Sequence, residues 1–161
     1  MKFYGQLFSG LLATFVLSLG SVAFADTVPD CQAGGQSLTV NDAQVLIWKQ
    51  TTANQFRGRA HIQGTLQKIY PDHSGHHHFQ VKIGTGADDT IEVIYNEAFG
   101  LLPAYQVGSQ IEACGDYITS NQRSGHLPAS PDGAIVHWVH KAPAGGHDSG
   151  YLAIDGTVCG Q

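Results

Sequence analysis

The chain has 161 residues and a formal net charge of −5, with 42% hydrophobic residues, 13% charged residues and 20 glycines. This length suits one small domain, and the charged fraction is about half of the usual quarter. The composition therefore argues against a coiled coil, a long helical bundle and a charged disordered chain, and it favours a small domain rich in β-strands.

The first 25 residues have the features of a secretory signal peptide. Lys2 precedes an apolar stretch from Leu7 to Val22, and the small-x-small sequence Ala23-Phe24-Ala25 follows directly. Serines and glycines interrupt the stretch, which argues against the alternative of a membrane anchor. We predict cleavage after Ala25 and a periplasmic or secreted product that has no further membrane span.

Three cysteines follow the predicted cleavage site. An exported protein meets an oxidising compartment, so we expect one disulfide and one free thiol. Cys31 and Cys159 lie near the two ends of the mature chain, and chain ends often meet at a domain surface, whereas Cys114 lies in a strand-like segment. The predicted pair is therefore Cys31 with Cys159, and Cys114 is expected to be a buried free thiol.

One helix is predicted close to the N-terminus. Apolar residues follow helical spacing between Thr39 and Ala53, and Thr39 with Asp42 resembles a capping box. The β-branched and aromatic run Val45–Trp48 leaves a strand as the alternative. This helix belongs to an N-terminal segment, residues 26–58, that precedes the main domain at residues 59–161.

From Arg59 onward the apolar residues alternate with a period of two, as in β-strands. The turn residues Pro71–Gly75 separate the first two strands, which we expect to form a hairpin. A long loop rich in Ser, Asn, Gly and Pro is predicted at residues 119–133. Later strands are predicted at residues 91–95, 111–119 and 134–140, with a short last one within residues 151–158.

Five to six short strands with one early helix predict a mainly β fold. The architecture that fits best is a small, partly open barrel of the oligonucleotide/oligosaccharide-binding (OB) type.

Histidine is the unusual residue of this chain. All nine histidines follow the predicted signal peptide, and they are His61, His73, His76, His77, His78, His126, His137, His140 and His147. Histidine is the commonest metal ligand and a frequent acid or base near neutral pH. Each one alone is most simply a solvent-facing residue, but several fall at predicted strand ends or loops, where they can converge. His137 and His140 are three residues apart, so they share a site only where the strand ends or bulges.

The standard signatures of metal, nucleotide and lipase-type sites are missing from the sequence. It has no Cys-x-x-Cys, His-Glu-x-x-His or Gly-x-Ser-x-Gly motif, no calcium loop and no glycine-rich nucleotide motif. The negative net charge disfavours nucleic-acid binding. A small basic edge is nevertheless expected from Lys49, Arg57, Arg59 and Lys68. Trp48 and Tyr70 lie beside these residues, and core packing is the commoner use of such aromatic side chains.

Four segments of the chain carry a recognisable pattern. They are residues 72–79 (DHSGHHHF), 115–117 (GDY), 137–140 (HWVH) and 147–150 (HDSG). Together they resemble a family of small exported bacterial proteins that is defined only as a domain of unknown function, over about residues 59–156. The resemblance implies an exported β-rich domain, with family histidines at His76, His137, His140 and His147. Tyr95 stands where the family usually has histidine, and the loop at residues 119–133 is longer than in the family.

The leading hypothesis is an exported barrel that binds a transition metal, zinc or copper, through His76, His137, His140 and His147. The alternative is a metal- or histidine-dependent hydrolase of the nuclease or esterase type, with His137, His147 and Asp148 as candidate catalytic residues. A turn is the simpler role for Asp148. A third interpretation is a module that binds nucleic acid or oligosaccharide. The sequence identifies no partner and no substrate.

Overall fold

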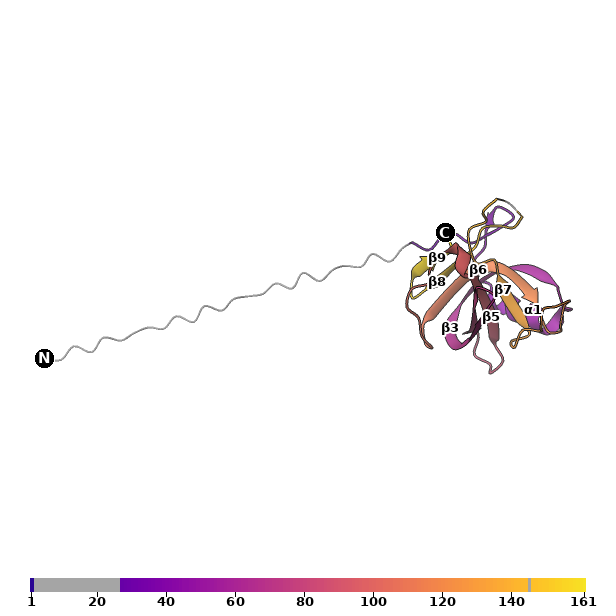
Figure 1. Cartoon of the computed structure of the whole chain (residues 1–161), viewed down its shortest axis with the longest axis horizontal. Helices are drawn as coiled ribbons and strands as arrows, with labels where there is room; N and C mark the ends of the chain where they lie inside the picture. The colour runs from indigo at the N-terminus through magenta and orange to yellow at the C-terminus, as the bar shows by residue number, and fades with distance from the viewer. Residues whose placement is uncertain (2–26, 145) are drawn as a thin grey trace.

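The computed structural model describes Met1, residues 27–144 and residues 146–161 (Figure 1). The predicted signal peptide at residues 1–25 therefore lies, apart from Met1, outside the described residues. Among the described residues, no helix has the length and apolarity needed to cross a bilayer.

Five strands form a ring of hydrogen-bonded neighbours. In ring order they are β3 (Arg57–His73), β4 (His76–Lys82), β5 (Thr90–Asn96), β7 (Ala134–His137) and β6 (Gln110–Thr119), which pairs back with β3. Only β5 and β7 run parallel, and their pairing spans just Glu92 with Ile135 and Val93 with Val136. The short seam leaves the ring partly open, which confirms the predicted small, partly open barrel of the OB type.

Four shorter strands complete the fold. β8 (Tyr151–Ile154) pairs with β6, and β9 (Thr157–Cys159) pairs with β8, so the single strand predicted within residues 151–158 divides into two. β1 (Gln32–Ala33) and β2 (Gln36–Ser37) form a separate hairpin. A short 3₁₀ helix, η1 (Glu97–Phe99), follows β5.

The predicted helix is present as α1 (Asp42–Thr51), and it begins later than the capping-box pattern suggested. Its N-cap residue is Asn41, whose side chain binds the neighbouring strand instead of capping the helix. Asn41 accepts a hydrogen bond from the N–H of His61 and donates one to the carbonyl of Arg59. These two bonds fix the start of α1 against β3.

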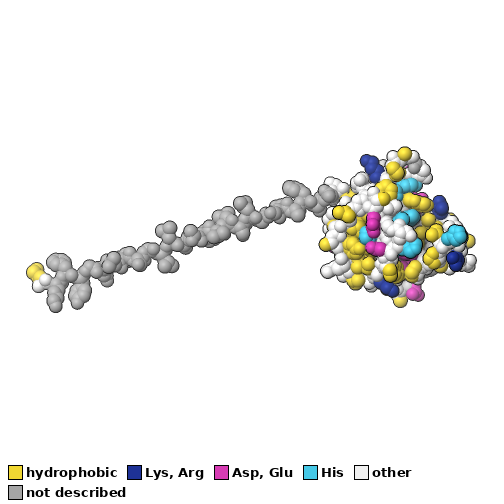
Figure 2. Space-filling model, viewed as in Figure 1, with side chains coloured by type: hydrophobic (Ala, Val, Ile, Leu, Met, Phe, Trp, Pro, Cys, Tyr) yellow, Lys and Arg dark blue, Asp and Glu magenta, His cyan; other side chains and the backbone are white. Residues whose placement is uncertain are grey.

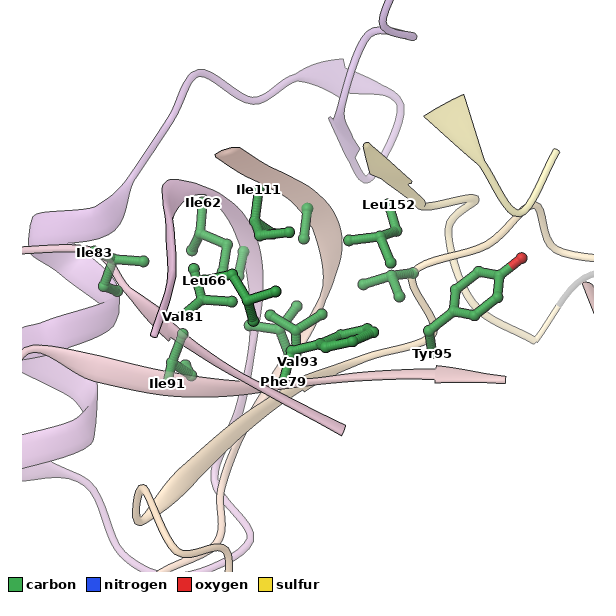
Figure 3. Packing of buried hydrophobic residues seen from close by; sticks show 14 of the residues in the cluster. Ile62, Leu66, Phe79, Val81, Ile83, Ile91, Val93, Tyr95, Ile111 and Leu152 are labelled. Atoms are coloured by element: carbon green, nitrogen blue, oxygen red, sulfur yellow. The ribbon is translucent and has the colours of Figure 1, made fainter. Parts of the chain in front are cut away.

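Alternating side chains of the ring strands fill the barrel interior. Figure 3 shows Ile62 and Leu66 of β3 facing Phe79 of β4 and Val93 of β5, and all four are fully buried. The helix adds Val45 to this core and packs Leu46 and Trp48 against it, whereas Ile47, which belonged to the apolar spacing read from the sequence, is 51% exposed. The opposite side chains of the same strands point outward.

The disulfide joins Cys31 to Cys114, so the predicted pair of Cys31 with Cys159 is wrong. Cys114 points away from the barrel core into a smaller cluster with Cys31, Tyr151 and Ala153. Cys159 instead packs into the main core and is a free, buried cysteine. Closing a loop over a separation of 83 residues contributes about 4.5 kcal/mol in the chain-entropy account.

Candidate metal-binding site

The strand that carries His137 ends at that residue. Trp138 has a φ of 53°, a left-handed conformation that bulky side chains rarely adopt. The prediction extended this strand to His140, so the observed break comes three residues earlier. It removes the strand alternation that would separate His137 from the histidines after it.

A glycine allows the close approach of the main chain at this break. A Cβ atom on Gly150 would collide with the carbonyl oxygens of Cys114 and Trp138. The N–H of Gly150 also donates to the carbonyl of His140 at 2.7 Å. Gly150 therefore holds the segment that carries His140 against strand β6.

The four histidines expected as ligands lie together as two pairs. The ring centroids of His76 and His137 are 5.7 Å apart, and those of His140 and His147 are 5.1 Å apart. The indole of Trp138 stacks with one ring of each pair, at 5.0 Å from His137 and 5.8 Å from His147. Two imidazoles on one tetrahedral zinc ion have centroids about 5 Å apart, because a Zn–N bond is about 2.0–2.1 Å long. Each pair has about this centroid spacing, but no three of the four histidines, all of which the structure describes, bring ligating atoms within 4.8 Å of one another.

Three of these four rings hold Nδ1 against a main-chain carbonyl oxygen. The distances are 2.9 Å from His76 to Ser74, 2.9 Å from His140 to Lys141 and 2.8 Å from His147 to Asp148. A carbonyl oxygen only accepts, so Nδ1 carries a proton and, in the neutral ring, Nε2 keeps a free lone pair. Metal-ligating histidines usually have this arrangement.

His137 is half-buried beside the other three histidines, and His140 is buried. Burial, together with the neighbouring His76, His140, His78 and His147, lowers the pKa of His137 to about 4. Its imidazole is therefore neutral at pH 7, which is the form that binds a metal. Burial also lowers the pKa of His140, whose ring stacks on Phe99 at a centroid distance of 3.5 Å.

Asp148, a candidate catalytic residue, anchors the loop that carries His147. Its Oδ2 accepts a 2.7 Å hydrogen bond from the N–H of Gly34 in the β1–β2 hairpin. Arg59 supports the same loop by donating to the carbonyl of Ser149 at 2.5 Å. Figure 1 shows the indigo hairpin beside the gold loop, near the C-terminus.

Sequence reasoning missed a second group of ligand-type side chains, formed by Asp72, His77 and Glu97. His77 places Nδ1 3.0 Å from a carboxylate oxygen of Asp72 and Nε2 3.7 Å from one of Glu97. In the part of the chain that the structure describes, only this group brings three ligating atoms within 4.8 Å of one another. Because the two nitrogens face different carboxylates, the imidazole bridges two acids. Asp72 lies in the predicted turn and His77 follows it, so the sequence did indicate that these two side chains lie close together.

The remaining histidines have other environments. His61 uses both nitrogens, with Nδ1 2.7 Å from the carbonyl of Leu38 and Nε2 2.9 Å from Glu112. Burial raises the pKa of Glu112, but hydrogen bonds from Tyr151, His61 and Gln63 outweigh it and leave the pKa below its usual value. His61 is therefore part of a cross-strand polar network. His78 contacts Glu92, and both His73 and His126 are exposed.

The predicted basic edge consists of side chains that are each engaged within the protein. Lys49 donates to the carbonyls of Asp88 and Thr90, and Arg59 forms an ion pair with Asp116. Arg57 lies over the Trp138 ring at 5.3 Å, and Lys68 lies over the Tyr70 ring at 5.0 Å. Trp48 packs against the core, as its simpler interpretation predicted.

Figure 2 shows several histidine side chains gathered on one face of the domain, with acidic side chains among them. Comparison with known proteins adds nothing to this geometry: no family model, no curated protein and no solved structure matches the chain.

Proposed function

We propose that this chain is an exported domain that binds a transition metal ion through His76, His137, His140 and His147. The observation that carries the proposal is the arrangement of three of these rings. Each donates its Nδ1 proton to a main-chain carbonyl, which leaves Nε2 free for a metal. The fourth ring, His137, is neutral at physiological pH because its pKa is about 4.

A set made only of imidazoles suits zinc and copper better than magnesium or calcium, which prefer oxygen ligands. The two pairs of rings offer two ligands each, and the Trp138 indole lies in contact with both pairs. Imidazole rings turn readily about the bond to Cβ. Because no three of the four described histidines bring ligating atoms within 4.8 Å of one another, binding of one ion requires ring movement that brings the two pairs together.

Export is the second part of the proposal. It is supported by the signal-peptide pattern of the first 25 residues and by the disulfide between Cys31 and Cys114, since disulfides persist in oxidising compartments. The resemblance to a family of small exported bacterial proteins agrees with both features. The proposed location is the periplasm or the extracellular medium.

Titration of the exported, tag-free protein with zinc and with copper tests the proposal. Trp138 reports binding by fluorescence once Trp48 is replaced by phenylalanine, because its indole contacts two of the ligands. We expect His137→Ala and His147→Ala to abolish binding. His73→Ala and His126→Ala serve as matched controls, since both side chains are exposed and lie outside the four-histidine set. Equal metal affinity in all four variants would refute the site.

The hydrolase alternative stays a prediction with less support. It assigned Asp148 as an acid beside His147, and the carboxylate of Asp148 instead accepts the N–H of Gly34. A purified protein that hydrolyses a nuclease or esterase substrate only when His137 is intact would favour it.

A further inference from the structure

A groove on the outer face of the barrel is separate from the four histidines. It has a volume of about 430 Å³, within the range of about 300–1,000 Å³ that is usual for small-molecule sites. Ile94 of β5 and Ile135 of β7 form part of its lining. The loop between β6 and β7 forms the opposite wall with Leu127 and Pro128.

The groove combines these apolar walls with one buried acid. Glu92 is only 5% exposed, and its carboxylate lies 2.6 Å from Nδ1 of His78, which also lines the groove. Within the described residues, this is the single hydrogen bond recorded for the Glu92 carboxylate. A buried carboxylate is costly unless several donors satisfy its oxygens, so Glu92 has acceptor capacity left for a ligand.

Among the described residues that line the groove, the one charged side chain other than histidine is Glu92, while Lys68 lies over the ring of Tyr70, which also lines the groove. Asp132, which is 7% exposed, lies behind the groove and accepts hydrogen bonds from Tyr70, Gln80 and Thr90. Among the described residues, neither lysine nor arginine lines the groove. At the Glu92 carboxylate a phosphate or carboxylate ligand would therefore meet negative charge, whereas a cation is attracted.

We propose that this groove binds a small organic cation, with a flat apolar body between the isoleucines and the Leu127 wall and an ammonium group on Glu92. The ammonium supplies charge-assisted hydrogen bonds to the carboxylate, and the body covers the apolar walls. This ligand contacts none of the four proposed metal ligands, although the groove residue His78 neighbours His137.

Three indoles of similar size and different charge test the ligand class. Tryptamine is a cation at pH 7.5, tryptophol is neutral and indole-3-acetate is an anion. We titrate each into the mature protein and follow the main-chain amide signals of Ile94, Leu127 and Ile135 by NMR. We expect tryptamine to bind at least tenfold more tightly than tryptophol, and indole-3-acetate to bind more weakly than both. Equal affinities for the three indoles would overturn the proposal.

Two variants separate the contribution of Glu92 to binding from that of the apolar wall. Glu92→Gln should weaken tryptamine at least tenfold and leave tryptophol unchanged. Leu127→Ser, at an exposed loop position that is 69% accessible, should weaken both indoles while preserving their order. Glu97→Gln removes an exposed acid outside the groove and should change neither. If Glu92→Gln does not fold, the relative affinities of the three indoles for the wild type and for Leu127→Ser decide whether the proposal holds. A folded Glu92→Gln protein with unchanged tryptamine affinity would also overturn the proposal.

Discussion

The main-chain N–H of Gly34 donates a 2.7 Å hydrogen bond to Oδ2 of Asp148, and the two residues are 114 positions apart. This bond joins the β1–β2 hairpin, which follows the disulfide cysteine Cys31, to the loop that carries His147. Arg59 makes a second connection between the same parts, because it donates both to the carbonyl of Gln32 and to that of Ser149. The position of His147 thus depends on contacts between its loop and segments that are far from it in the sequence.

Replacement of Asp148 by alanine should weaken metal binding by about tenfold, which is the usual effect of losing a group that positions a ligand. Thermal stability should change little, since Asp148 is exposed. Asp88→Ala removes an equal charge from another exposed loop and should leave affinity unchanged. Identical zinc affinities for these two variants would show that the bond to Gly34 does not position His147.

Stability should fall as the metal-free protein is acidified. His137 takes up a proton near pH 6.5 in the unfolded chain and near pH 4 in the folded one. Below pH 6.5 the unfolded state therefore binds more protons, and the free energy of unfolding decreases by up to about 3 kcal/mol between pH 6.5 and pH 4. Urea unfolding at pH 7.5 and pH 4.5 measures this loss. It should shrink in His137→Gln and persist in His126→Gln, and an equal loss in both would contradict the assignment.

Gly150→Ala should destabilise the protein by about 1–3 kcal/mol, the usual cost of overpacking. The new Cβ would collide with the carbonyl oxygens of Cys114 and Trp138, so the Trp138 segment must shift. Gly108→Ala is a useful comparison, because Gly108 has a φ of 100° and open space around its Cβ position. It therefore reports the cost of backbone strain alone. Only Gly150→Ala should also weaken zinc binding in the fluorescence titration.

The sequence alone predicted the approximate positions of the main strands, the first hairpin, the helix and the partly open barrel, because these depend on local periodicity and turn residues. The disulfide was predicted wrongly because closeness of the chain ends was weighed above side-chain alternation. Alternation on β6 turns Cys114 outward toward Cys31, and Cys159 turns into the core. The pairing therefore follows from the direction in which each cysteine side chain points, and not from how close the cysteine lies to a chain end.

The grouping of His76, His137, His140 and His147 was expected from a resemblance, and no rule of spacing required it. We expected His137 and His140 to share a site only where the strand ends or bulges. The strand does end at His137, but a tryptophan at the next position gives no sign of the left-handed conformation, which is typical of glycine or asparagine. Contacts such as Gly34 with Asp148 join distant segments, and a single sequence carries no sign of them. The same holds for the contacts of His61, which taken alone was most simply a solvent-facing residue.

His61→Ala should destabilise the protein by about 1–3 kcal/mol without changing metal stoichiometry. Its loss removes the hydrogen bond to the Leu38 carbonyl and one of three side-chain hydrogen bonds to Glu112, which keeps those from Tyr151 and Gln63. His73→Ala, at an exposed strand end, is the control and should leave the melting temperature unchanged. If His61→Ala has the same melting temperature as the wild type, the network contributes nothing to stability.

The central claim is that Nε2 of His76, His140 and His147 is free and binds the metal. Long-range ¹H–¹⁵N NMR of the imidazole rings tests it most directly, because it distinguishes the two neutral tautomers and detects metal on either nitrogen. In the metal-free protein at pH 7.5 we predict the Nδ1–H tautomer for all three rings, and zinc should shift their Nε2 signals. A protonated Nε2 in these rings, or Nε2 signals that zinc leaves unchanged, would contradict the account.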